Sequence, residues 1–270
     1  MVVQHNLTAM NANRQLGITT SAQAKSSEKL SSGYKINRAA DDAAGLAISE
    51  KLRSQIRGLN QASDNCQDGI SLIQTAEGAL NETHSILQRL NELAVKSSTD
   101  TNTTEDRAYI QQEVTALTTE VTRISTDTEF NKMKLLSGGI KNFKLQVGAN
   151  AEQEIQFDIS DMSAKALGIS KLSLSSQAGA SGAITTLANA IKSVSNQRSQ
   201  LGALQNRLEH TIANLDTAAE NAQSSESTIR DTDMASEMVN YSKNNILAQA
   251  GQSMLAQANQ SSQGVLSLLQ

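Results

Sequence analysis

Proline and aromatic residues are the two most informative absences from this 270-residue chain. The sequence has no proline, whereas average usage would give roughly 13, and long uninterrupted helices are the simplest reason. Aromatic residues make up 2% of the chain and tryptophan is absent, so a large rounded core is hard to fill. The abundant alanine, leucine, glutamine, serine and asparagine suit helices that pack closely along their length.

Other absences exclude several classes of protein. No stretch approaches the roughly 18 apolar residues of a membrane span, and the N-terminal MVVQHNLTAMNANRQLG lacks the basic-then-apolar plan of a cleavable signal. The net charge of -4 offers no broad basic surface. We therefore expect no membrane insertion and no nucleic-acid partner. Cys66, the single cysteine, excludes an intramolecular disulfide framework; its place on a helical seam indicates a small buried hydrophobe, with a reactive thiol as the alternative.

Catalytic and metal-binding motifs are also missing. His5, His84 and His210 are far apart, and no HExxH, GxxxxGK[ST], GxGxxG or GxSxG occurs. Asp41 and Asp42 are adjacent, but neighbouring residues on a helix do not face each other. We expect no catalytic residue, metal site or cofactor, and therefore a protein that is not an enzyme.

The stretch LSSGYKINRAADDAAGLAISEKL (residues 30 to 52) instead indicates a joint between two helices. Negative charge at a helix N-terminus is stabilised by the helix dipole and by unpaired N–H groups, and Asp41 and Asp42 precede a long helical pattern. Gly33 supplies backbone freedom, and Arg38 is a candidate charge partner. The predicted joint covers about residues 33–43.

Hydrophobic periodicity predicts long packed helices on both sides of a short β region. A seven-residue repeat predicts one helix over about 44–98, on the order of 80 Å long. The turn-rich run STDTNTTEDR ends it, and a second helix begins near Glu105. Two alternating segments within NFKLQVGANAEQEIQFDIS predict a β-hairpin. The run SLSSQAGASG (173–182) indicates a linker before a third helix from 184. The repeat of the first helix consists of Leu52, Leu59, Cys66, Ile73, Leu80, Leu87 and Ala94.

The two ends of the chain predict helices of another kind. Residues 3 to 32 and about 232 to 270 carry scattered small apolar residues that can bury only a thin strip. Since isolated helices are marginal in water, we expect these ends to gain order through self-association. The fold class is therefore mainly α: a long antiparallel helical bundle or coiled-coil rod, a small β-hairpin region and paired terminal helices. Residues 1–43 and 228–270 form the expected terminal-helix domain, and residues 44–227 form the rod domain, with its hairpin region at about 140–175.

Several long motifs resemble those of bacterial flagellin. They are LSSGYKINRAADDAAGLAISEKL, NQASDNCQDGISLIQTAEGALNE, LQRLNELAVKSS, and the segment AENAQSSESTIRDTDMASEMVNYSKNNILAQAGQSMLAQANQSSQGVLSLL. The resemblance covers roughly residues 1 to 140 and 180 to 270, in the family's order. The short middle resembles a core-only flagellin without variable outer domains.

This resemblance implies a structural subunit that polymerises into the extracellular flagellar filament used for motility. It further implies type III export as an unfolded chain, secretion without a cleavable signal, and binding to an export chaperone, a filament cap and hook-junction proteins. The implied polymerisation residues are the apolar side chains of the terminal segments: Leu7, Met10, Met234, Met238, Ile246, Met254, Leu255, Leu266 and Leu269.

The resemblance also implies recognition by Toll-like receptor 5. By position within LQRLNELAV and IQQEVTAL, the matching residues are Arg89, Leu93 and Glu113. Arg89 and Leu93 are four apart and share a helix face, and Glu113 is expected on the neighbouring helix. Asn91 departs from the arginine that many strongly recognised flagellins carry there.

Two alternatives remain beside the filament subunit. A flagellin-like hook-filament junction protein shares the terminal helices, but it does not normally match the central motifs so fully. A soluble coiled-coil binding module explains the seven-residue repeat, but it does not explain terminal helices that cannot be covered within one chain.

Overall fold

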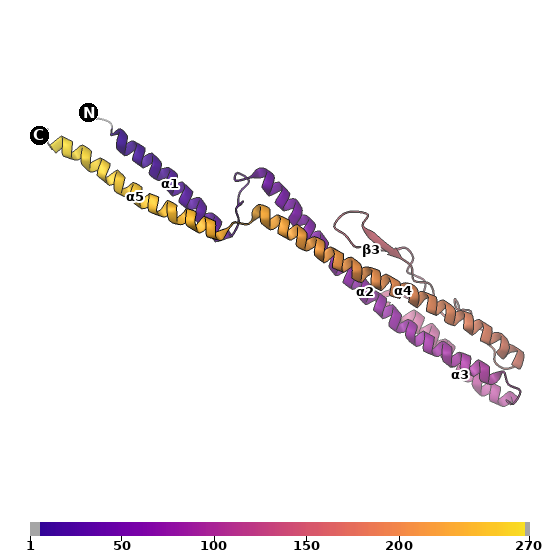
Figure 1. The fold of residues 1–270 in the computed structure, drawn as a ribbon. Helices are drawn as coiled ribbons and strands as arrows, with labels where there is room; N and C mark the ends of the chain where they lie inside the picture. Colours follow the sequence, from indigo (N-terminus) through magenta and orange to yellow (C-terminus); the bar gives the residue numbers. More distant parts are fainter. Residues whose placement is uncertain (1–5, 268–270) are drawn as a thin grey trace. The chain divides into compact units, whose positions relative to one another are not determined.

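The computed structural model describes the backbone of residues 6–267 and the side chains of residues 6–261. Over this range the chain forms five α-helices and two antiparallel two-stranded hairpins (Figure 1). The helices are α1 (Leu7–Ser32), α2 (Ala43–Ser97), α3 (Thr104–Asp127), α4 (Gln177–Arg230) and α5 (Met234–Ser267). The mainly α fold class predicted from the sequence is confirmed.

The chain divides into two compact units. The terminal unit contains the residues up to 54 and from 221 onward, and the central unit contains residues 55–220. This division lies further along α2, and earlier in α4, than the expected boundaries at 43/44 and 227/228. The first turns of α2 belong to the terminal unit because they contact the last turns of α4: the buried Ser49 Oγ donates to Glu226 Oε1 at 3.0 Å.

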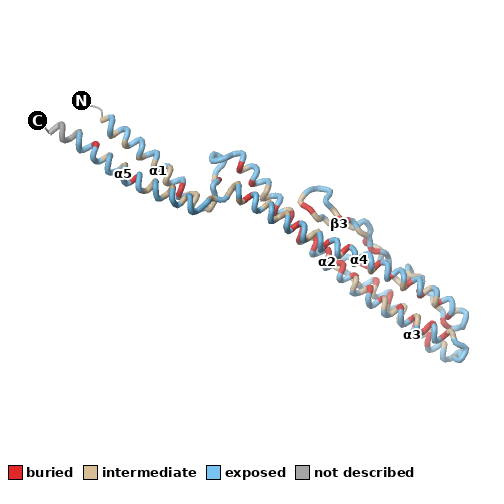
Figure 2. The backbone as a smooth tube through the Cα atoms, viewed as in Figure 1, coloured by how far each residue is buried: buried red, intermediate tan, exposed pale blue. Residues whose placement is uncertain are grey.

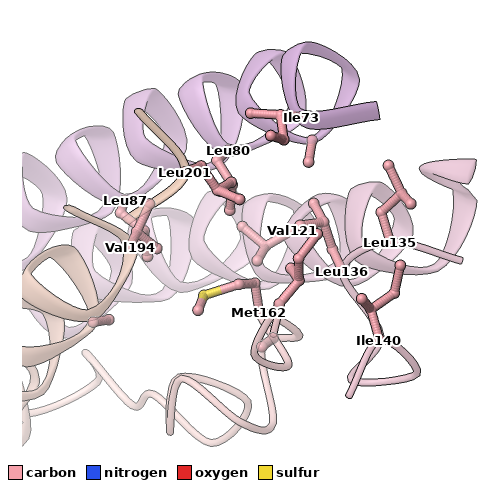
Figure 3. Close-up of a cluster of buried hydrophobic side chains, with 14 of the residues drawn as sticks. Ile73, Leu80, Leu87, Val121, Leu135, Leu136, Ile140, Met162, Val194 and Leu201 are labelled. Atoms are coloured by element: carbon pink, nitrogen blue, oxygen red, sulfur yellow. The ribbon is translucent and has the colours of Figure 1, made fainter. Parts of the chain in front are cut away.

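The core of the central unit follows the periodic stripes of α2, α3 and α4. The repeat of α2 is buried from Leu59 to Ala94, whereas Leu52, in the terminal unit, is half-buried. Figure 3 shows how side chains from the three helices meet in this core. Those labelled there on the helices are Ile73, Leu80, Leu87, Val121, Val194 and Leu201.

A capping box fixes the start of α3. Thr103 Oγ1 accepts from the backbone N–H of Asp106 at 3.2 Å, and the Asp106 carboxylate accepts from the backbone N–H of Thr103 at 3.0 Å. These two bonds satisfy backbone donors that the first helical turn leaves unpaired. Arg107 Nε then donates to Ser97 O at 3.2 Å, which holds the end of α2 beside the start of α3.

The predicted hairpin consists of β3 (Phe143–Gln146) and β4 (Glu154–Phe157). Phe143 pairs with Phe157, and their ring centroids are 5.1 Å apart. On the same face Leu145 pairs with Ile155, which is buried against the central core. The prediction from the alternating pattern is therefore confirmed for both strands and for the face that they turn toward the core.

A second hairpin was not predicted from the sequence. It joins β1 (Glu129–Phe130) to β2 (Met133–Lys134) through Asn131 and Lys132, whose φ angles are 48° and 63°. Two consecutive positive φ angles are typical of a tight type I′ turn, which is usually recognised by glycine. The missing glycine and the two-residue strands explain why sequence periodicity did not reveal it.

The expected linker at 173–182 is wrong in its second half, because α4 begins at Gln177. Ser176 Oγ accepts from the backbone N–H of Gly179 at 3.2 Å, and Ser176 O accepts from Ala180 N at 2.9 Å. Ala180 and Ala183 are buried. Helix capping and tertiary burial of small residues thus outweigh the low helix propensity of the local glycines.

Candidate functional site

The terminal unit is built around an antiparallel pair of helices. Figure 1 shows α1 beside α5, and Asn6 Nδ2 donates to Ala258 O at 2.9 Å. Asn6 also accepts from Ala9 N at 3.0 Å, so it caps the start of α1. Further along the pair, a Cβ atom added to Gly251 would lie 3.4 Å from Leu16 Cδ1. That distance is an ordinary van der Waals contact, so an alanine would also fit at this point of the helix pair.

This helix pair buries very little. Among residues 6–261, Ser26 is the buried residue of α1, and Ala248 and Ala258 are those of α5. Figure 2 shows the difference from the central unit, where buried residues recur along α2, α3 and α4. Two helices held by such a thin strip bury too little apolar surface to account for their order.

Large apolar side chains on these helices remain in contact with water. Most of the candidate polymerisation residues belong to this set, and Leu255 is half-buried. The side chain of Leu266 and the whole of Leu269 lie outside the described residues. The exposed large apolar residues of α1 and α5 are Leu7, Met10, Ile18, Met234, Met238, Val239, Ile246, Leu247 and Met254.

The exposed residues of α5 surround the helix rather than forming one stripe. Ala248 is buried, whereas Ile246, two positions earlier, lies on the opposite side of the helix and is 66% exposed. Val239 is seven positions from Ile246 and shares that exposed side. Large apolar side chains on a side of a helix that no neighbour covers are available for contact with another helix, and α1 covers one side of α5 alone.

The part of α5 that follows Lys243 also lacks charged residues, whereas the first turns of this helix carry Glu237 and Lys243. No Asp, Glu, Lys or Arg follows Lys243 in the sequence. Burying this part of α5 would therefore not require removing charged groups from water, which is the largest cost of burying a polar surface. The chemistry of this surface suits close contact with other helices of similar composition.

Two backbone crossings connect the terminal helices to α2 and α4. Gly33 ends α1 with a φ of 76°, a left-handed conformation that favours glycine. Lys35 N donates to Arg230 O at 2.7 Å, and Thr232 N donates to Gly33 O at 2.9 Å. A short antiparallel β-bridge between Tyr34 and Asp231 thus holds together the two segments that connect the helices.

Arg230 is the central side chain of this joint, although sequence reasoning did not identify it. Its guanidinium lies 4.8 Å from the centroid of the Tyr34 ring, and its Nη1 lies 2.8 Å from Glu50 Oε1. The hydrogen bond from Arg230, followed by the charge of Arg53, lowers the pKa of the Glu50 carboxyl. No local pattern could reveal this cluster, because its members come from three distant segments.

The residues predicted at the joint have separate roles. Asp42 Oδ1 accepts from Gly45 N at 2.9 Å at the start of α2. Asp41 Oδ2 accepts from the backbone N–H of Arg38 at 3.0 Å, and this bond lowers the pKa of the Asp41 carboxyl. Arg38 does not pair with either aspartate side chain: its guanidinium binds Glu28 on α1 at 3.0 Å. The structure therefore corrects the expected charge partner of Arg38.

The residues matched to the receptor epitope divide between surface and core. Arg89 on α2 and Glu113 on α3 are exposed and form an ion pair at 2.9 Å. Hydrogen bonds to Glu113 and then to Glu92 raise the pKa of Arg89. Leu93 is 2% exposed and belongs to the central core. A protein partner can therefore reach Arg89 and Glu113, whereas Leu93 supports the surface from beneath.

The residues that could perform chemistry are dispersed. Within the part of the chain that the structure describes, no three His, Cys, Asp or Glu side chains form a group that could hold a metal ion. Cys66 is fully buried, and burial raises the pKa of its thiol. His84 Nε2 lies 3.0 Å from Gln88 Nε2, His210 is exposed, and His5 lies outside the described residues. No described helix is long and apolar enough to span a membrane.

Comparisons with protein families match both helical parts of the chain. Residues 3–141 match the family described as the bacterial flagellin N-terminal helical region. Residues 184–269 match the family described as the bacterial flagellin C-terminal helical region. Together the two matches cover α1, α2, α3, α5 and the part of α4 from residue 184 onward.

Full-length relatives and solved structures are similar to this chain. The flagellin of Halalkalibacterium halodurans is 55% identical over 271 residues, and that of Bacillus subtilis is 51% identical over 306, each alignment covering 100% of both chains. The flagellar filament 31.3 kDa core protein of Treponema maltophilum is 52% identical over 286 residues, with the same coverage.

Among solved structures, the Bacillus cereus flagellin crystal structure matches with a TM-score of 0.52 at 29% identity. It covers 56% of this chain and 88% of that chain. A Vibrio parahaemolyticus protein, provisionally described as a flagellar hook-associated protein, matches with a TM-score of 0.60 over 71% of this chain and 100% of that chain. Its identity of 12% shows a shared fold alone.

Proposed function

Because this chain belongs to the bacterial flagellin family, we propose that it is a structural subunit that self-assembles into the helical flagellar filament used for motility. The observation that carries the proposal is the apolar side chains that α5 exposes on several sides, together with the absence of charged residues after Lys243. A second copy of the chain is the partner that fits this surface, since its own terminal helices have the same composition. The subunit would act without catalysis or a cofactor.

Assembly would be driven by burial of the terminal helices. Each large apolar side chain that passes from water into a helical contact contributes roughly 1.5–3 kcal/mol. Within the described residues, α1 and α5 expose nine such side chains, so their joint burial can offset the entropy lost when a subunit joins a polymer. The central unit has its own core and would fold without this contribution.

Seeded growth tests the proposal directly. Full-length chain added to short filament fragments should extend them into helical filaments visible by electron microscopy. Chains lacking residues 1–32 or 236–270 should retain a folded central unit, measured by circular dichroism, yet fail to extend the seeds. Filaments of truncated chain, or a full-length chain that stays monomeric at every concentration, would contradict the proposal.

The same experiment separates the alternatives. A soluble coiled-coil binding module would remain monomeric, and a hook-filament junction protein would bind the ends of seeds without continued growth. The full-length identities of 51% and 55% to flagellins favour the filament subunit. The terminal domain of residues 1–43 and 228–270, and the rod domain of residues 44–227, would then lie in the inner and outer parts of the filament.

Export would deliver the subunit to the outside of the cell. We propose type III secretion of the unfolded chain through the flagellum, with an export chaperone bound to the C-terminal segment until assembly. The exposed apolar side chains of α5 support this partner, because an uncovered surface of this kind favours aggregation. The filament cap and the hook-junction proteins would contact the same terminal helices. Pulldown of a chaperone by residues 219–270, and its loss after removal of 236–270, tests the assignment.

Recognition by Toll-like receptor 5 is a second proposed activity, supported by the exposed Arg89–Glu113 ion pair. Replacing Arg89 and Glu113 together by alanine should weaken binding of the monomer to the receptor. Arg123→Ala is a matched control, because Arg123 is exposed on α3 and pairs within that helix with Glu120. Unchanged receptor affinity in the double variant would rule out this surface as the epitope.

A further inference from the structure

We propose that four methionines on the terminal helices are oxidation sites through which peroxide controls the assembly of free subunits. They are Met10 on α1 and Met234, Met238 and Met254 on α5. The inference rests on the proposed function, because these thioethers belong to the surface that assembly would bury.

The placement of the methionines separates them into two groups. The described residues include six, and the four on the terminal helices are each 47% to 64% exposed. In the central unit, Met162 is 4% exposed in the core, and Met133 beside the β1–β2 turn is 39% exposed. Soluble oxidants can therefore reach the terminal methionines of a free subunit, whereas Met162 is protected by packing.

The chemistry requires a two-electron oxidant such as hydrogen peroxide. The methionine sulfur donates an electron pair to one peroxide oxygen, an S–O bond forms, and the O–O bond breaks. The second oxygen leaves as water after proton transfer, so sulfur is oxidised and peroxide is reduced. Cys66 offers no competing site, since it is fully buried and burial raises the pKa of its thiol.

Oxidation changes the property on which assembly would depend. A sulfoxide is polar and accepts hydrogen bonds, whereas the thioether is apolar. Burying a sulfoxide in a helical contact without a donor carries a desolvation cost. At Met254 the chain supplies no cationic donor on α5, because no Lys or Arg follows Lys243. Sulfoxides at four places on α1 and α5 should therefore oppose addition of the subunit to a filament.

The experiment compares free and polymerised chain treated with hydrogen peroxide. Peptide mass spectrometry should find one added oxygen at each terminal methionine of the free subunit, with Met162 unmodified. Preformed filaments should gain oxygen at the terminal methionines about tenfold more slowly. Oxidised subunits should extend seeds about tenfold more slowly than untreated subunits, or fail to extend them. Treatment with methionine sulfoxide reductases of both epimer specificities should restore growth.

Leucine variants identify the residues responsible, because leucine resembles methionine in size and is not oxidised. The terminal variant carries M10L, M234L, M238L and M254L and should keep its growth rate after peroxide. The control variant carries M133L and M162L. After peroxide treatment it should extend seeds as slowly as the oxidised parent does. If the terminal variant packs too poorly to assemble, reductase rescue of the oxidised parent provides the same test.

The outcomes distinguish this inference from the proposed function. Equal growth of oxidised and untreated parent, or peroxide sensitivity retained by an assembling terminal variant, would overturn the oxidation proposal alone. Failure of reductase treatment to restore growth would do the same. Untreated parent that never extends seeds would overturn the filament function, and the oxidation proposal with it.

Discussion

Replacement of Ile246 by alanine should impair assembly while leaving the free subunit folded. Ile246 lies on the side of α5 opposite the buried Ala248 and is 66% exposed. Because the free chain already covers about a third of this residue, truncation removes few contacts from the monomer. Alanine also has the higher helix propensity, so the thermal unfolding midpoint should change little.

The effect on assembly can be estimated from the exposed fraction. Full burial of an isoleucine side chain contributes about 1.5–3 kcal/mol relative to exposure. Two-thirds of Ile246 remains to be covered, so its burial in a filament contributes about 1–2 kcal/mol. Since 1.4 kcal/mol corresponds to tenfold in an equilibrium constant, the critical concentration should rise by about 5- to 30-fold.

Sedimentation of seeded polymers over a range of subunit concentrations measures this quantity. Met133→Ala is the control, because Met133 is partly exposed in the central unit, outside the terminal helices. A critical concentration for Ile246→Ala within about twofold of the parent's would show that burial of Ile246 does not drive assembly. Unfolding of the free variant would instead show that the exposed side chain has a structural role in the monomer.

Three other perturbations test particular parts of the structure. Leu80→Ala, at a fully buried position in the central core, should lower the free energy of unfolding by about 2–5 kcal/mol in denaturant titrations. Gly33→Ala introduces a side chain at a φ of 76° and should destabilise the terminal unit by about 1 kcal/mol. Amide hydrogen exchange in α1 should therefore be faster than in the parent, and an equal rate would argue against backbone strain at this position. The hydrogen bond from Arg230 holds the folded-state pKa of Glu50 below the ordinary value of a glutamate carboxyl. The stabilising pair is therefore present above that ordinary pKa and is lost as pH falls through the folded-state pKa. In the Arg230→Leu variant the thermal unfolding midpoint should therefore fall less steeply as pH is lowered. An unchanged dependence of the midpoint on pH would count against this ion pair.

Local sequence patterns determined most of the secondary structure. The seven-residue repeat from Leu59 to Ala94 defines α2 because side chains that recur at helical spacing lie on one face. Thr103 and Asp106 begin α3 through bonds between residues three positions apart. The alternation at Phe143 and Leu145 similarly specifies a strand. Each of these features depends on neighbouring residues, so a single sequence contains the necessary information.

Tertiary structure alone decided which distant side chains meet. Asp41 and Asp42 follow Arg38 closely in the sequence, but the Arg38 guanidinium pairs with Glu28 on α1 instead. Leu93 shares a helical face with Arg89, yet the packing of α2 against the central core buries it.

The joint at Arg230 shows the reason most clearly, since its contacts with Tyr34 and Glu50 join segments nearly 200 residues apart. Periodicity specifies which side of a helix is apolar. The folded arrangement of helices determines what that side contacts, and on α5 it leaves exposed the apolar residues for which the sequence predicts cover through self-association.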